Sequence, residues 1–446
     1  RQMCIRDRYY KILTTPESFQ KVKDAFEELE MSAQCSCFLL FDECHKLVKD
    51  ADYRSDITLP IDDFFKFDQK ALVSATPIEL NDPRFKEQNF QTIEIQPTFD
   101  YKKEIWLHHT NNTLQAFKNV LSKLNNEEAA PLPICVFINS TDIIYSLMKQ
   151  LDLLEESAVF CAPKSVDKLK KNRFCNVYEQ WNKDKMKRYN FFTSRFFNAV
   201  DMELEEQPHV IMLTDVYFAE HTMIDPYTDA IQIVGRFRNG VSSITYISNT
   251  KKGLPQRSKE EIKGYLICSK EIYRTMKNFY DCATDRASRD AYRAALESLP
   301  FNRMLDRNGR ENWFAIDNYM DEELMKNYFY DENSLYKAYD NCDSFIVYHA
   351  GYYCPLGDSE RLKRENKSQS IKDKRKEIVR QLEMLGDCVT EMELEYKRDL
   401  IAADSFIVEA YDTVGKEVIE KLKYSKKKIT EAMIQKQYSE KATGTE

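Results

Sequence analysis

The chain has 446 residues, of which 43% are hydrophobic and 12% aromatic, and its formal net charge is -8. This length and composition exclude a disordered or fibrous chain and predict a multidomain globular protein. No apolar run is long enough for a membrane span and no secretory leader pattern is present, so we expect a cytoplasmic protein with reduced cysteines. The negative net charge excludes binding to nucleic acid by overall basicity, but it leaves room for a local basic groove.

The first eight residues, RQMCIRDR, show no apolar period and look like a cloning or sequencing artefact. From residue 9 to about residue 250, short apolar runs alternate with helical stretches, which is typical of βαβ units and a parallel sheet. Eight strands are predicted, at residues 10–15, 36–42, 70–76, 133–139, 157–162, 189–194, 209–215 and 243–249.

Two polar segments divide the predicted α/β region. Residues 94–104 contain a proline and no helical period, so they predict a linker between a first lobe, residues 9–98, and a second lobe, residues 99–250. The connector TKKGLPQRSKEE then leads into tyrosine-rich helical stretches, which predict a mainly helical accessory domain over residues 251–446. The expected class is therefore α/β, with parallel sheets followed by a helical C-terminal domain.

One stretch of the helical region is strongly basic. Residues 361–380, RLKRENKSQSIKDKRKEIVR, carry nine Lys or Arg against three Asp or Glu. Such a stretch can be a helix that faces phosphates, or simply a solvated helix face. The sequence leaves both interpretations open.

Two adjacent carboxylates end the strand predicted at residues 36–42, in the sequence FLLFDECH. Asp42 could hold Mg²⁺ through water, while Glu43 could orient or deprotonate an attacking water, as phosphoryl transfer requires. An acidic turn after a strand is the alternative.

Hydroxyl residues end the next predicted strand, in KALVSATP. Ser74 and Thr76 could relay hydrogen bonds from a nucleotide site, or they could belong to a proline-containing turn.

A third stretch, AIQIVGRFRNG at residues 230–240, places two arginines after a glycine. Gly235 permits a tight backbone, and Arg236 and Arg238 could neutralise charge on a transferred phosphate. A surface turn is the alternative for this stretch as well.

The three stretches together resemble motifs II, III and VI of superfamily 2 helicases and translocases of the DExH-box kind. DECH at residues 42–45, SAT at 74–76 and QxxGRxR at 232–238 match in identity, order and approximate spacing. The resemblance covers residues 9–250 and implies two RecA-like lobes, of which the first is incomplete. The short GRFRN form is similar to replication origin-binding helicases of viral and mobile-element type.

The resemblance implies catalytic roles. Asp42 would bind Mg²⁺ and Glu43 would activate water, while His45 would work with Ser74 and Thr76 to couple hydrolysis to movement.

It also implies that Gln232 and Arg236 approach the γ-phosphate, that Arg238 is a second finger, and that Gly235 and Asp201 lie on the nucleotide side.

Weaker motifs imply contacts with nucleic acid. TTPESF at residues 14–19 looks like motif Ib, VFINSTD at 136–142 like motif IV, and FFTSRFFNAVDM at 191–202 like motif V. Each is also a strand end followed by a helix cap, which is the geometry that makes a phosphate site. The implied nucleic-acid-binding residues are Thr15, Asn139, Ser140, Thr193 and Ser194.

The family's phosphate-binding loop is missing from the sequence. No G-x-x-x-x-G-K-[ST] occurs in the 446 residues. We therefore expect a fragment of an ATP- and Mg²⁺-dependent helicase that does not hydrolyse ATP by itself.

The expected partner is nucleic acid, DNA rather than RNA, together with replication or mobile-element proteins. A non-catalytic nucleic-acid-binding scaffold and the motor subunit of a restriction or remodelling complex remain open alternatives.

Overall fold

The computed structural model describes residues 11–51, 55–58, 60–126, 131–198, 200–306, 308–365, 370–388 and 390–443. The predicted artefact at residues 1–8 lies outside these ranges. By their contacts the residues group into two compact units. The first comprises residues 1–101, 225–232 and 253–330, and the second comprises residues 102–224, 233–252 and 331–446.

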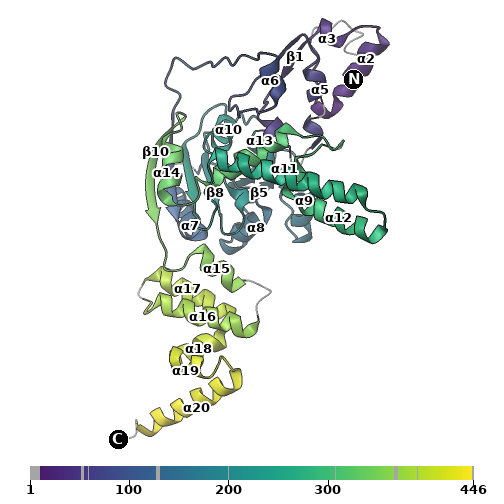
Figure 1. Ribbon diagram of the computed structural model, residues 1–446. Coiled ribbons are helices and arrows are strands. Elements are labelled where there is room, and N and C mark those ends of the chain that lie inside the picture. Colours follow the sequence, from purple (N-terminus) through teal and green to yellow (C-terminus); the bar gives the residue numbers. More distant parts are fainter. Residues whose placement is uncertain are drawn as a thin grey trace. The chain divides into compact units, whose positions relative to one another are not determined.

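The predicted α/β class is confirmed, with parallel strands in each unit and a helical C-terminal region (Figure 1). None of the helices in the described part of the chain combines the length and apolar character that crossing a bilayer requires. The segment after residue 250 does not stay together, because residues 253–330 group with the first unit and residues 331–446 with the second. The domain limits read from the sequence therefore stay a prediction.

The first unit contains a parallel sheet of two strands, β1 (Phe38–Phe41) and β2 (Gln69–Leu72). Its helices before residue 102 are η1 (Pro16–Ser18), α2 (Phe19–Glu28), α3 (Ala33–Ser36), α4 (Lys46–Lys49), η2 (Ser55–Thr58), α5 (Ile61–Phe64) and α6 (Pro83–Glu87). Residues 11–15, predicted as a strand, have no regular structure.

One face of this small sheet is open to solvent. Phe38 is 58% exposed, Leu40 51% and Val73 45%. Parallel sheets are normally covered on both faces, so an apolar face in water is unusual.

The later part of the first unit is helical. Its helices are α11 (Lys259–Cys282), α12 (Arg286–Ser298), η6 (Pro300–Met304) and α13 (Trp313–Lys326). Helix α13 packs into the core beside α4 and α5, since Phe314 and Ala315 belong to the same buried cluster as Leu47 and Phe64. The sequence after residue 250 thus completes the core behind the DECH segment.

The second unit contains an eight-stranded parallel sheet in the order β10-β3-β9-β8-β4-β7-β5-β6. The strands are β3 (Lys103–Thr110), β4 (Ile134–Phe137), β5 (Ser157–Phe160), β6 (Val177–Tyr178), β7 (Tyr189–Phe192), β8 (His209–Thr214), β9 (Ser243–Ser248) and β10 (Phe345–Tyr352). Every residue of β4, β5, β7 and β8 is buried, as expected for central strands of a parallel sheet.

Helices connect and flank these strands. The helices between strands are α7 (Thr113–Asn125), α8 (Thr141–Gln150), α9 (Pro163–Lys171), η3 (Lys183–Lys185), η4 (Ser194–Phe196), η5 (Glu220–Thr222) and α14 (Glu332–Asp340). The C-terminal helices are α15 (Asp358–Glu365), α16 (Ile371–Leu385), α17 (Glu391–Ala403), α18 (Ser405–Val414), α19 (Lys416–Lys421) and α20 (Lys426–Thr443). Helices α16–α20 share a separate apolar core.

Candidate functional site

The DECH and SAT segments meet because β1 and β2 are parallel neighbours. The amide of Val73 donates to the carbonyl of Phe41, and the amide of Cys44 donates to the carbonyl of Val73. The carboxyl ends of neighbouring parallel strands lie at one edge, where α/β sheets place their ligand sites. Asp42 and Ser74 therefore lie at the same edge of the sheet.

Side-chain hydrogen bonds connect the three sequence motifs within the first unit. His45 Nδ1 lies 2.9 Å from Ser74 Oγ and 3.3 Å from Glu43 Oε2. Ser74 Oγ also accepts from the amide of Thr76 at 3.0 Å. The amide nitrogen of Gln232 donates to Thr76 Oγ1 at 3.0 Å and lies 3.4 Å from Glu43 Oε2. Residues that are up to 189 positions apart thus form one polar cluster.

This cluster is largely shielded from solvent. His45 and Thr76 are each 2% exposed and Gln232 is 3% exposed, whereas Glu43 is only half-buried. Buried polar groups need hydrogen-bond partners, because each one left without a partner costs roughly 1 to 3 kcal/mol. The buried members therefore fix one another, and Glu43 is the member that reaches water.

The backbone at Glu43 is strained. Its φ is +52°, a left-handed conformation that side chains larger than Asn or Asp seldom adopt. Such strain concentrates at functional sites, where the surrounding structure holds it in place. The carboxylate of Asp42 accepts the amide of Glu43 at 2.9 Å and so supports this turn.

The largely buried ammonium group of Lys49, not anticipated from the sequence, secures the start of α10 (Asp229–Gly235). Lys49 Nζ lies 2.6 Å from Asp321 and 3.4 Å from Asp225. Burial alone would lower the pKa of Lys49, but Asp229, Asp225 and Asp321 together hold it above its usual value. Burial in turn raises the pKa of Asp229 to about 6 despite the attraction of Lys49. Lys49 follows His45 by one helical turn, so its spacing could have indicated this role.

One face of helix α13 contacts the chain that follows the SAT segment and the chain that follows the DECH segment. Asp317 accepts hydrogen bonds from the amide and the side chain of Asn81, at 3.0 and 2.8 Å. Asp321, one turn later on the helix, faces Lys49. Burial raises the pKa of Asp317 to about 6, against the hydrogen bonds from Asn81, which favour the charged form. No sequence signal linked this helix to residues 236 positions earlier.

The donor set at this edge suits Mg²⁺ held through water. Asp42 is exposed, and a carboxylate is a ligand type that Mg²⁺ prefers. Across the described residues, no group of three or more His, Cys, Asp and Glu side chains could hold a metal ion directly. The residues fit Mg²⁺ through Asp42, but the sequence offers no loop of the usual type for the phosphates of a nucleotide.

The two arginines of GRFR lie in the second unit and both meet Asp201. Arg236 is 3.3 Å from one oxygen of Asp201 and Arg238 is 2.9 Å from the other. The chain passes from the first unit to the second between Gln232 and Ile233, inside α10. A Cβ added at Gly235 would meet no atom within 4 Å. The space around this position therefore does not require glycine, although the sequence predicted a tight backbone there.

The residues predicted to bind nucleic acid follow strand ends. Asn139 follows β4 and donates to the carbonyl of His221 at 3.0 Å, and Ser140 caps α8 by accepting the amide of Ile143. Thr193 is buried after β7. These positions share the carboxyl edge of the eight-stranded sheet.

The other two predicted residues are exposed. Ser194 follows Thr193 in the second unit, and Thr15 precedes η1 in the first unit.

A buried ionic network occupies the same edge further along the sheet and was not predicted. Asn249, after β9, donates to Asp215 at 2.8 Å and to Asp358 at 2.9 Å. Arg361 lies 3.1 Å from each of these carboxylates. Burial, and then repulsion by Asp215, holds the pKa of Asp358 well above its usual value. Arg361, counted in the basic stretch, therefore faces the protein interior.

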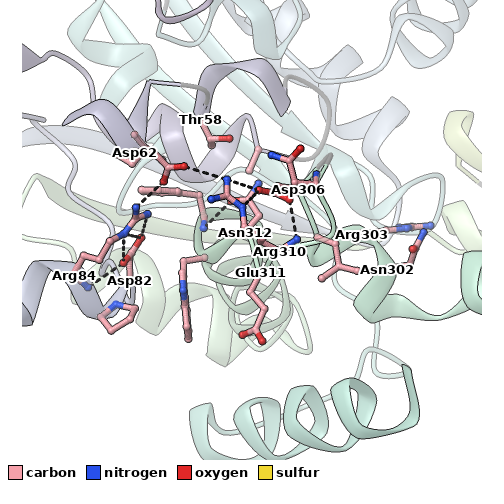
Figure 2. Close-up of a pocket in the computed structure, with 17 residues that line it drawn as sticks. Thr58, Asp62, Asp82, Arg84, Asn302, Arg303, Asp306, Arg310, Glu311 and Asn312 are labelled. Carbon is pink, nitrogen blue, oxygen red and sulfur yellow. Dashed lines mark hydrogen bonds and ion pairs between the residues drawn. The ribbon is translucent and has the colours of Figure 1, made fainter. Parts of the chain in front are cut away.

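A cavity of about 760 Å³ lies elsewhere in the first unit (Figure 2). Arg84 contacts Asp82 at 2.6 Å and Asp62 at 2.7 Å, and Arg310 contacts Asp62 at 3.1 Å and Asp306 at 2.9 Å. Hydrogen bonding by Arg84, and then by Arg310, lowers the pKa of Asp62 against the opposing effect of burial. None of the candidate site residues lines this cavity.

Comparisons with known proteins are sparse. No protein-family model matches the chain, and no curated protein sequence matches it. Among solved structures, the chain is similar to Dbp5 of S. cerevisiae bound to RNA and ADP BeF3, with 14% identity, 68% of each chain covered and a TM-score of 0.32. A variant of Dbp5 in the same bound state matches with 13% identity, the same coverage and the same score. A TM-score this low leaves the function to be inferred from the chain's own residues.

Proposed function

We propose that the chain is part of an ATP-dependent helicase or translocase, a motor that moves on nucleic acid. The observation that carries the proposal is the contact of Gln232 with both Glu43 and Thr76. Residues from three motifs that the sequence orders as in superfamily 2 motors meet in one polar cluster. A chance resemblance of short motifs would give no reason for these side chains to meet.

The proposed chemistry assigns separate tasks to neighbouring groups. Mg²⁺, when held through water by Asp42, would neutralise charge on phosphate oxygens. Glu43 reaches solvent and would accept the proton of an attacking water. Gln232 orients the Glu43 carboxylate, and His45 holds Ser74, so a change at the carboxylate is felt at the SAT segment. Arg236 and Arg238 are the proposed source of positive charge for the transferred phosphoryl group.

The proposal also states that this chain does not hydrolyse ATP by itself. Because it contains no G-x-x-x-x-G-K-[ST], we expect no ATP turnover by these 446 residues alone. A natural form that carries such a loop is expected to hydrolyse ATP only when nucleic acid is present. We also propose that the nucleic acid is DNA rather than RNA and that the motor acts in replication.

The test compares Glu43→Gln with Glu27→Gln, a control on the exposed side of α2. In the loop-containing form, Glu43→Gln should lower nucleic-acid-stimulated phosphate release by at least about 100-fold, the usual worth of a general base. Binding of nucleic acid should be unchanged, and Glu27→Gln should behave as wild type. Undiminished turnover in Glu43→Gln would overturn the proposed role of Glu43. ATP turnover by these 446 residues alone that Glu43→Gln abolishes would overturn the expectation that this chain is inactive by itself.

A non-catalytic scaffold is the second candidate. The observation that favours it is the missing phosphate-binding loop. It predicts that every natural form binds nucleic acid with no ATP turnover and with no effect of Glu43→Gln on binding.

A further inference from the structure

The basic stretch read from the sequence is divided by the structure. Arg361 is committed to the buried network, and Arg380 contacts Glu377 at 2.6 Å. The lysines in the first turns of α16 are placed differently. Lys372 and Lys376 are exposed, and within the described residues neither has an ion-pair partner.

A second basic segment, from far along the chain, joins these lysines. Helix α20 begins with Lys426, Lys427 and Lys428, all exposed. The ammonium group of Lys426 lies 5.3 Å from the ring centre of Phe406, and the guanidinium of Arg375 lies 5.0 Å from the same centre. Two cations on one ring bring the starts of α16 and α20 together.

Among the basic residues at the starts of α16 and α20, Arg375 has an ion-pair partner. Arg375 contacts Asp404 at 2.8 Å, which fixes α16 against the start of α18. Lys427 and Lys428, like Lys372 and Lys376, have no acidic partner within the part of the chain that the structure describes. We name these four lysines the α16–α20 lysine cluster.

Neighbouring ammonium groups repel one another, and an anion bound between them relieves this repulsion. Like charges within about 10 Å repel one another at physiological salt, and the net charge of the chain is -8, so the cluster is no part of a general positive surface. Lys372 and Lys376 follow one another along the helix by about 6 Å, so they form a row rather than a single pocket. A row of ammonium groups suits a chain of phosphates.

We propose that the α16–α20 lysine cluster binds the phosphate backbone of nucleic acid. The inference rests on the proposed function for the choice of partner and on the convergence of α16 and α20 for the place. The cluster adds a second contact, outside the strand ends of the eight-stranded sheet, through which the helical region holds the substrate.

The test uses the intact chain with Lys372, Lys376, Lys427 and Lys428 all changed to Gln. The probe is a labelled single-stranded oligonucleotide of mixed sequence, titrated between about 50 and 200 mM salt. The matched control changes four exposed lysines elsewhere in the same unit, Lys103, Lys149, Lys170 and Lys171, to Gln.

We expect the cluster variant to bind at least about tenfold more weakly at low salt, with the slope of log affinity against log salt reduced by about 3. The control should keep the wild-type slope. Equal slopes in wild type and cluster variant would overturn the proposal and leave the proposed function standing. Absence of wild-type binding would overturn both, and cluster-dependent binding only to vesicles of anionic phospholipid would replace nucleic acid by a membrane surface.

Discussion

His45 Nδ1 lies 2.9 Å from Ser74 Oγ, and this bond joins the carboxyl ends of two parallel strands. His45 and Ser74 lie in the turns that follow β1 and β2, so the bond holds the DECH turn against the SAT turn. The ring of His45 is 2% exposed, which means that no water can easily replace the serine.

Ser74→Ala should therefore destabilise the first unit. It removes the partner of a buried imidazole and the acceptor of the Thr76 amide, with an expected loss of about 1 to 3 kcal/mol. Unfolding in denaturant measures this loss. Ser18→Ala, at a position with no side-chain capping bond, is the control, and an equal loss in both variants would contradict the role of Ser74.

Lys49→Met should be more damaging than Ser74→Ala. The change leaves the largely buried carboxylates of Asp225, Asp229 and Asp321 without their cation, and breaking a buried ion pair in this way costs up to about 3 to 5 kcal/mol. Thermal unfolding measures the loss, and Lys66→Met, at a largely exposed lysine of the same unit, is the control. If Lys49→Met combined with Asp321→Asn were no more stable than Lys49→Met alone, the repulsion among these carboxylates would be ruled out as the cause.

Asp317 should make stability depend on pH between about 4 and 6. Its pKa is about 6 in the folded state and about 4 in the unfolded chain, so only the folded state holds the proton between these values. The stabilisation is fully present below pH 4 and is lost as the pH rises through 6, by up to about 3 kcal/mol. Comparing Asp317→Asn with wild type at several pH values isolates this contribution, because the other groups cancel. Parallel curves would show that Asp317 titrates as an ordinary carboxyl.

The ion pairs along the cavity should contribute unequally. Asp82 has 1% of its side chain exposed and accepts hydrogen bonds from the backbone amide, Nε and Nη2 of Arg84, so Asp82→Ala should cost about 2 kcal/mol. The side chains of Asp62 and Arg310 are 42% and 62% exposed, so water screens their ion pairs, and Asp62→Asn should cost much less than Asp82→Ala although Asp62 contacts two arginines. Equal losses in denaturant unfolding would contradict this ranking.

The sequence predicted the fully buried strands β4, β5, β7 and β8 together with β1, β2 and β9, because each is a short apolar run that ends in polar or small residues. It missed the two-residue strand β6, and it missed β3 and β10, which pair over eight residues at one side of the second sheet. Strand β3 alternates exposed and buried residues over its middle, and β10 is mostly exposed or half-buried. Residues 103 and 104 fall in the predicted linker, and residues 345–352 fall in the region predicted to be mainly helical. A partly exposed strand is recognised only when its partner is known, and here the partners are about 240 residues apart.

The candidate site also contains residues that the sequence predicted and residues that it did not. Asp42, Glu43, Ser74, Thr76 and Gln232 could be proposed from short motifs because each follows a recognisable strand or precedes a recognisable glycine. The anchoring of the site by Asp317 and Asp321 could not, since two acids one turn apart on a helix resemble any solvated face. Only the packing of Phe314 beside Leu47 turns that face towards the site.

The open face of β1 and β2 affects how the protein behaves in solution. Phe38, Leu40 and Val73 present aromatic and branched side chains to water next to Asp42. Exposed apolar side chains on a sheet that has two strands within the described residues invite contact with a second molecule. Light scattering by this chain should therefore rise with protein concentration, and substitution of Leu40 by a charged residue should suppress the rise. Ligand titrations at the DECH turn are best made with dilute protein, where neighbouring molecules do not cover it.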